Sequence, residues 1–137
     1  MNVMITNQSR FFIDESKMKS LAERVLLNEG AENKEISIAF VSNSEIKKIN
    51  NDYRNLNEIT DVLSFSHNGE GLKGTGIDLI GEVIISPQKV FQDGSSIERV
   101  LIHGILHLLG YDHKTDFEED LMREKESFYL SSDLKKG

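Results

Sequence analysis

Three of the chain's four histidines lie within eleven residues, HGILHLLGYDH (103–113). Neutral imidazole is a common ligand for transition metals. His103 and His107 are four residues apart, so on a helix their rings project from adjacent turns of one face and can bind one ion. Gly110 tolerates a left-handed conformation and predicts the end of that helix, after which the chain can reverse and return His113 to the same ion. The spacing therefore predicts one metal ion held by His103, His107 and His113.

The spacing HxxxHxxGxxH is also that of the metzincin proteases, whose pattern is HExxHxxGxxH. The difference is Gly104, which stands where these proteases have the glutamate that acts as general base. Three neutral imidazoles and an open fourth position are typical of a catalytic zinc site, where the pKa of a bound water falls to about 7. We therefore expect metal-assisted hydrolysis, and a peptidase mechanism is the weaker alternative because glycine cannot accept a proton.

The alternative to a metal site is a buried polar cluster. A single histidine on an apolar helix is usually a hydrogen-bonded core residue. Three imidazoles buried together without a metal would need several dedicated partners, so the spacing favours the metal. The expected ion is one Zn²⁺ per chain, although three imidazoles also suit nickel, copper or cobalt. His67, the fourth histidine, ends an expected strand and is interpreted as exposed or structural.

Length and composition restrict the class of protein. The 137 residues are 38% hydrophobic and 28% charged, as expected for one compact domain over residues 1–137 that can fold without a structural metal. There is no cysteine, which leaves histidine, carboxylate and water as ligands. No apolar run is long enough to cross a membrane, so we expect a soluble cytoplasmic protein without a membrane partner. The net charge of −7 argues mildly against broad nucleic-acid affinity, including for DNA.

Hydrophobic periodicity and turn residues predict the elements that position these histidines. Expected strands cover residues 2–6, 35–41, 62–67 and 79–86, and expected helices follow Asp14, Ser42, Pro87, Ser95 or Ser96, and Thr115. The helix of residues 97–109 is apolar on most sides and is expected at the centre of the molecule. The last helix is expected to present Phe117, Leu121, Met122 and Phe128, and the tail from residue 131 to fray.

These elements predict an α+β fold, in which helices pack on a small mixed sheet of about four strands and a zincin-like helix carries the metal ligands. The segment NGEGLKGTG (68–76) has four glycines but no helix after it. It is therefore interpreted as a flexible excursion and not as a phosphate-binding loop.

Three segments together resemble the YbeY family of bacterial endoribonucleases. They are HGILHLLGYDH, YRNLNEITDVLSFS (53–66) and IGEVIISP (80–87), and the resemblance spans most of residues 35–126. The family pattern HGxLHLxGYDH is matched throughout, and TDVLSF is matched by residues 60–65. The resemblance implies a metal-dependent endoribonuclease, specific for single-stranded RNA, that acts in maturation of the 16S ribosomal RNA 3′ end and in ribosome quality control. Zinc is the implied metal, and the ribosome or its proteins are the implied partners.

By position, the family's three metal ligands fall on His103, His107 and His113, and its active-site arginine falls on Arg54. The resemblance implies catalytic roles for Arg54 and His113. An arginine beside a metal presents a fork of donors to phosphate, whereas the alternative is a helix C-terminal arginine that neutralises the last carbonyls. The chain departs from the family at residues 55–59, which replace its usual Lys, Asp and Pro.

Two carboxylates could orient a ligand imidazole. Glu82 stands where the family commonly has aspartate, and Asp112 lies in the GYDH turn, which it could instead stabilise. Two other functions stay open beside the endoribonuclease. One is a zinc metallopeptidase-like hydrolase on the same ligand spacing, and the other is a non-catalytic, ribosome-associated module whose metal only stabilises the fold.

Overall fold

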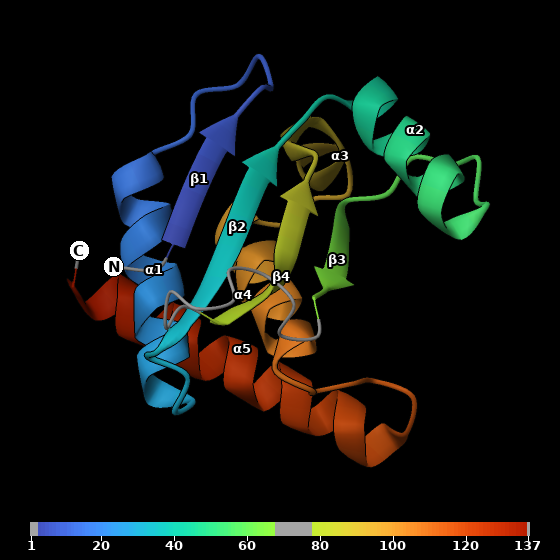
Figure 1. The fold of residues 1–137 in the computed structure, drawn as a ribbon. Coiled ribbons are helices and arrows are strands. Elements are labelled where there is room, and N and C mark those ends of the chain that lie inside the picture. Colours follow the sequence, from blue (N-terminus) through green and yellow to red (C-terminus); the bar gives the residue numbers. More distant parts are fainter. Residues whose placement is uncertain (1–2, 68–77, 137) are drawn as a thin grey trace.

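The computed structural model describes residues 3–67 and 78–136 (Figure 1). The strands are β1 (Val3–Asn7), β2 (Lys34–Phe40), β3 (Val62–Ser66) and β4 (Asp78–Ile85). The helices are α1 (Glu15–Asn28), α2 (Asn43–Arg54), α3 (Pro87–Gln92), α4 (Ile97–Leu108) and α5 (Asp116–Lys136). The glycine-rich segment 68–76 lies outside the described residues. The prediction of an α+β fold with a small mixed sheet is confirmed.

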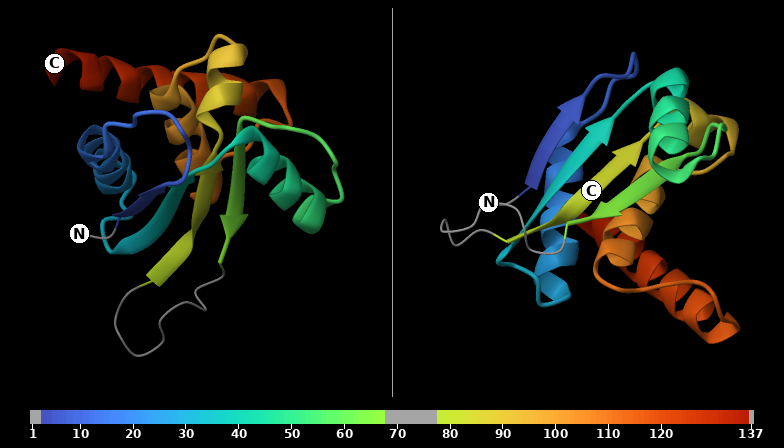
Figure 2. Two further views of the ribbon diagram at one scale, coloured as in Figure 1. Left: turned by 90° about the horizontal axis from the view of Figure 1, so that it is seen from above. Right: turned by 45° about the vertical axis from the view of Figure 1, so that its right-hand side comes forward.

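The sheet has the order β1-β2-β4-β3, in which the first three strands are parallel and β3 is antiparallel to β4. Alternation along β2 turns Ile36, Ile38 and Phe40 to one face, where all three are fully buried. Helices α1, α4 and α5 gather on that face (Figure 2) and form the main core with it. On the other face, α2 covers a smaller cluster that includes Ile46 and Leu63.

Helix α4 lies at the centre of this arrangement, as its sequence predicts. It begins after Ser96, whose hydroxyl accepts a hydrogen bond from the Arg99 backbone N–H at 3.2 Å and so caps the helix. Leu101, Ile102, Ile105 and Leu106 are fully buried. A helix packed on several sides offers little freedom for its side chains, so groups carried on α4 are held at defined positions.

Helix α5 begins with a reciprocal cap in which the Glu118 N–H donates to the Thr115 hydroxyl and the Thr115 N–H donates to the Glu118 carboxylate, both at 3.1 Å. The expectation that the chain frays from residue 131 is wrong, because the helix continues to Lys136. The tail has no proline, and its one glycine is residue 137, so nothing in it stops a helix whose preceding turn is anchored by buried Tyr129.

The buried face of α5 contains only some of the apolar residues that the sequence places on this helix. Of the apolar residues predicted on this helix, Phe117 and Phe128 are 76% and 58% exposed, whereas Met122 is buried. The residues that face the core are Met122, Glu126 and Tyr129, at helical spacings of four and three. A buried glutamate breaks the apolar pattern of this face, so apolar periodicity alone does not identify it. No helix in the described part of the chain is long and apolar enough to span a membrane.

Candidate metal centre

The structure brings His103, His107 and His113 together at the C-terminal end of α4. The ring centroids of His103 and His113 are 5.5 Å apart, and those of His107 and His113 are 6.3 Å apart. Two imidazoles bound tetrahedrally to one zinc ion at about 2.0 Å have ring centres roughly 5 Å apart. The three imidazoles are donors that suit a zinc-sized ion, and their rings stand somewhat further apart than in a formed site.

The three rings would have to move to bind one ion together. Within residues 3–67 and 78–136, no three or more His, Asp or Glu side chains stand with their donor atoms already arranged to hold a metal. His107 and His113 are exposed, so rotation about their side-chain torsions meets little resistance. His103 is the most enclosed of the three and is the ring that the protein itself fixes.

The turn after α4 returns His113 to the helix. Gly110 has a positive φ of 106°, the conformation for which glycine is suited. The N–H of Gly110 donates to the carbonyl of His107 at 3.1 Å, and the N–H of Tyr111 donates to the carbonyl of Leu106 at 3.0 Å. These two bonds form a Schellman motif, which ends the helix and reverses the chain, as the sequence predicts.

Two neighbours of His113 hold the turn in place. The Asp112 carboxylate accepts a hydrogen bond from the His113 backbone N–H at 2.8 Å, and this bond lowers the pKa of Asp112. Asp112 thus bonds to the backbone of the turn. The Tyr111 hydroxyl donates to Glu29, at the end of α1, at 2.6 Å, so the turn is also fastened to another helix.

The carboxylate of Glu126, on α5, contacts His103 of the histidine cluster. Glu126 Oε2 lies 2.7 Å from His103 Nδ1, and its other oxygen accepts a hydrogen bond from Arg99 Nη1 at 2.9 Å. Since Nδ1 is occupied in this way, Nε2 is the nitrogen of His103 that remains for a metal. Neither Glu126 nor Arg99 is among the site residues predicted from the sequence. The available signal was the spacing Met122, Glu126, Tyr129, which puts a carboxylate on the inner face of α5.

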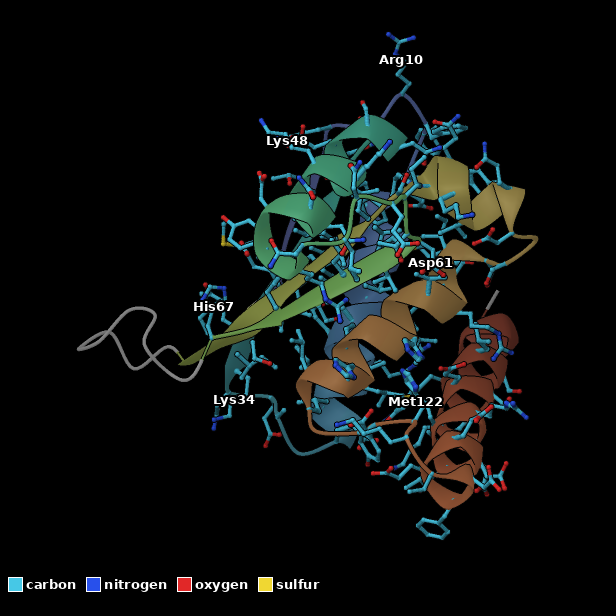
Figure 3. All side chains as sticks on the ribbon, turned by 90° about the vertical axis from the view of Figure 1, so that its right-hand side faces the viewer. Arg10, Lys34, Lys48, Asp61, His67 and Met122 are labelled. Carbon is cyan, nitrogen blue, oxygen red and sulfur yellow. The ribbon has the colours of Figure 1, made fainter. Side chains whose placement is uncertain are left out.

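A cavity of ≈ 200 Å³ lies beside His103. Its polar lining comes from Asp61, Ser95, Arg99, His103 and Glu126. Figure 3 shows Asp61 at the start of β3, beside the N-terminal part of α4, whereas His67 lies at the other end of that strand. A larger cavity of ≈ 550 Å³ near Arg10 has no histidine or carboxylate in its lining, so the smaller one is the candidate site.

Gly104 packs directly against the sheet. A Cβ atom at this position would lie 2.7 Å from Val83 Cγ1 and 3.3 Å from Ser64 Oγ. The Ser64 hydroxyl also donates to the Gly104 carbonyl at 3.2 Å. A glutamate in place of Gly104 would have to enter the packed layer between α4 and the sheet. The absence of a protease-type base here therefore has a packing reason.

Glu82 is not part of the cluster, which corrects the expectation that it orients a ligand imidazole. Along β4, Val83 and Ile85 face the main core, so Glu82 points to the opposite side of the sheet from α4. Its carboxylate lies 3.6 Å from Nε2 of His67. The alternation of the strand thus separates both residues from the other three histidines.

Arg54 is the last residue of α2, and Asn55 follows it in a left-handed conformation with a φ of 57°. Among the described residues, no hydrogen bond or ion pair joins Arg54 to the histidine cluster. Its neighbour Tyr53 contacts Phe65 of β3, with ring centroids 5.5 Å apart. Helix α2 thus meets one face of the edge strand β3 through Tyr53, and α4 packs on the other face through Gly104.

The fold and the site together define the class of protein: an α+β protein with a mixed four-stranded sheet, whose central helix and following turn present three histidines. A family model described as Endoribonuclease YbeY matches residues 4–133. The chain belongs to the YbeY family.

Relatives named Endoribonuclease YbeY cover almost the full chain. The protein from Pelotomaculum thermopropionicum is 40% identical over 145 residues, covering 95% of this chain and 95% of that protein. The protein from Thermoanaerobacter sp. (strain X514) is 36% identical over 149 residues, covering 92% and 93%. The solution structure of TM1509 from Thermotoga maritima has a TM-score of 0.63 and 26% identity, and covers 98% of this chain and 90% of that chain.

Proposed function

We propose that this protein is a metal-dependent endoribonuclease that cleaves single-stranded RNA. The observation that carries the proposal is the assembly of His103, His107 and His113 by a buried helix and a Schellman turn. It occurs in a chain whose relatives are named endoribonucleases. Hydrolysis of a phosphodiester needs an activated nucleophile and groups that bind phosphate, and the chain offers candidates for both.

The three imidazoles are the proposed ligands, and zinc is the proposed ion, with nickel or another transition metal as alternatives. When bound, such an ion supplies Lewis acidity and lowers the pKa of a water molecule to about 7. The chain holds His103 between two helices and His113 on a fastened turn, while His107 faces solvent. Exposure of His107 and His113 supports the proposal, because a polymer can reach them.

Arg54 is proposed to bind the phosphate of the scissile bond. A guanidinium offers paired donors that match phosphate geometry and can stabilise charge developing on its oxygens. RNA that crosses the edge strand β3 would contact Arg54 on one side and the histidines on the other. Tyr53, which is 75% exposed, offers a ring on which an unpaired base can stack, and this favours single-stranded substrates.

The proposed biological role is maturation of the 16S ribosomal RNA 3′ end, together with ribosome quality control. The family resemblance supports this role. The net charge of −7 gives the protein little general attraction for an RNA backbone. We therefore propose that the ribosome or a ribosome-associated protein brings it to its substrate.

A metallopeptidase function is less well supported by the geometry. The position that carries the general base in metzincins is Gly104, which faces the sheet and has no room for a side chain. Casein hydrolysis that is lost on chelation and on replacement of His103 would favour the peptidase over the nuclease.

The test of the proposed function is cleavage of a labelled single-stranded RNA by metal-loaded protein, compared with His113→Ala and Arg54→Ala. We expect His113→Ala to lose activity together with bound metal, and Arg54→Ala to retain the metal but to reduce kcat by about 100-fold or more, because a phosphate donor is lost.

Lys48→Ala is the matched control for Arg54→Ala, because it removes a positive charge from the same helix α2. It should leave cleavage nearly unchanged. Full activity in the His113→Ala protein would mean that the nuclease activity comes from a contaminant or from another site. Equal losses of cleavage activity in Arg54→Ala and Lys48→Ala would show that Arg54 contributes only its positive charge and does not bind the scissile phosphate.

A further inference from the structure

Glu126 is a charged residue in a place where charge is costly. It is 6% exposed, on the inner face of α5, and it lies opposite α4. A buried carboxylate is unfavourable unless both oxygens are satisfied. Here Arg99 Nη1 donates to one oxygen at 2.9 Å, and His103 Nδ1 lies 2.7 Å from the other. The two partners are four residues apart, so they lie on one face of α4.

We propose that Glu126 is the positioning residue of the metal centre, which holds the His103 ring in the orientation and tautomer that present Nε2 to the ion. This inference rests on the proposed metal site. It adds a residue from α5, 23 positions further along the chain, to a ligand set formed by α4 and its turn.

The tautomer follows from the chemistry of the contact. An ionised carboxylate accepts hydrogen bonds and donates none, so Nδ1 of His103 carries the hydrogen and Nε2 carries the lone pair. Metal-ligating histidines nearly always donate their second ring N–H to a carboxylate, a carbonyl or water, and this fixes the ring and makes the ligand more basic. Within the described residues, His103 is the one member of the cluster with such a carboxylate partner.

Arg99 has a supporting part in this arrangement. Its guanidinium occupies the second oxygen of Glu126, so the carboxylate cannot turn away from His103 without losing a charge-assisted hydrogen bond. Arg99 is 42% exposed at its side chain, whereas that of Glu126 is 8% exposed. The side chain of His103 is 32% exposed, so its contact with Glu126 is more enclosed than that of Arg99, which lies on the solvent side of the carboxylate.

The first measurement uses the metal-free, unsubstituted protein. Imidazole ¹⁵N chemical shifts recorded near pH 8, above the ordinary histidine pKa of about 6.5, report which ring nitrogen is protonated. We expect His103 to be in the Nδ1–H form. An Nε2–H form of His103 would overturn the proposal, and no substitution or refolding is involved.

The second measurement is zinc affinity, determined by competition with a chromophoric chelator. We expect Glu126→Ala to raise the zinc dissociation constant by about 10- to 100-fold, the usual loss when a ligand's supporting partner is removed. Glu126→Gln should show a smaller loss, because its amide oxygen can still accept from Nδ1. Glu119→Gln is the control: it removes a carboxylate from the same helix, where it pairs with Arg123 at the surface, and should leave the affinity unchanged.

A purely structural role for Glu126 predicts a different pattern. In that case Glu126→Ala and Arg99→Met would both lower the free energy of unfolding, while the zinc dissociation constant stayed within about twofold of the unsubstituted value, and the proposal would be wrong. A positioning role predicts that Arg99→Met keeps the Nδ1–H tautomer and loses less affinity than Glu126→Ala. If Glu126→Ala does not fold, Glu126→Gln and the tautomer measurement decide.

These readouts separate the inference from the proposed nuclease function. If substitution of Glu126 changes the zinc affinity as expected, and His103 is in the Nδ1–H form, but the protein cleaves no RNA, then the positioning role is retained and the nuclease function is rejected. If the protein cleaves RNA in a metal-dependent reaction but its His103 is in the Nε2–H form, the nuclease function is retained and the positioning role is rejected.

Discussion

Gly104 shows how one residue can decide which chemistry the histidine spacing serves. It lies between two candidate ligands, on the side of α4 that faces the sheet, and its missing side chain lets the helix approach Val83 closely. A larger residue would push α4 outward together with His103 and His107. The glycine therefore helps to position the proposed metal ligands, in addition to being the position where a protease carries its base.

Replacing Gly104 with alanine tests this close approach. Alanine favours a helix interior by about 1 kcal/mol over glycine, but overpacking a core costs about 1–3 kcal/mol. Because the new Cβ would lie 2.7 Å from Val83 Cγ1, we expect Gly104→Ala to lower the free energy of unfolding by about 1 kcal/mol in urea denaturation.

The control for that prediction is a double-mutant cycle with Val83→Ala. Val83→Ala alone removes buried atoms and should destabilise the protein, but in the Gly104→Ala background it also removes the clash. The double mutant should therefore lose less free energy of unfolding than the sum of the losses in the two single mutants. A Gly104→Ala protein as stable as the original would show that the helix and the sheet are not in close contact here.

At the scale of elements, Glu29 joins three parts of the molecule that are distant in sequence. Its carboxylate, at the end of α1, accepts hydrogen bonds from the hydroxyls of Tyr111 and Tyr129 and from Lys125 Nζ. Burial alone would raise the pKa of Glu29, but these donors together hold that pKa below its ordinary value. The turn that carries His113 is thereby tied to both α1 and α5.

The lowered pKa gives a pH-dependent prediction for Glu29→Gln. A carboxyl group whose pKa is lower in the folded state adds stability above its unfolded pKa, about 4.3, and loses it as the pH falls through the folded value. Near pH 7 we expect Glu29→Gln to cost about 2 kcal/mol, since hydrogen bonds to a charged group contribute about 1.5–3 kcal/mol. The difference from the original protein should shrink below about pH 4.3.

Urea denaturation between pH 7 and pH 3 measures this difference. Glu119→Gln is again the matched control, because its surface ion pair with Arg123 should contribute less than about 1 kcal/mol. A Glu29→Gln difference that is constant down to pH 3, or that grows on acidification, would contradict the assignment of the lowered pKa.

At the scale of the whole molecule, the main core does not include the three candidate metal ligands. It is formed by the inner face of the sheet with α1, α4 and α5, and its largest fully buried side chains include Phe40, Leu21 and Leu101. Figure 3 shows Met122 of α5 pointing toward α4, within this layer of helices. The candidate ligands lie at the surface end of α4, so the fold does not need an ion to bury its apolar groups.

Metal removal tests this independence. We expect the chelated protein to keep its far-UV circular dichroism spectrum and to melt cooperatively, at a lower Tm, because an ion that binds only the folded state adds stability by mass action. Loss of the helical spectrum on chelation, with no RNA cleavage by the loaded form, would instead support the metal-stabilised, non-catalytic module.

The sequence by itself determined the features of the protein that depend on local backbone geometry. The four strands, the caps at Ser96 and Thr115 and the turn at Gly110 follow from side-chain periodicity and from conformational preferences of single residues. The spacing of His103 and His107 on one helix face belongs to the same category. These features are local, so neighbours along the chain specify them.

Only the tertiary structure decided which distant groups meet. It placed Glu126 against His103 and turned Glu82 to the face of the sheet away from α4. Such contacts depend on how helices and strands pack, and a spacing pattern within one element carries no information about the side chain that another element will place beside it.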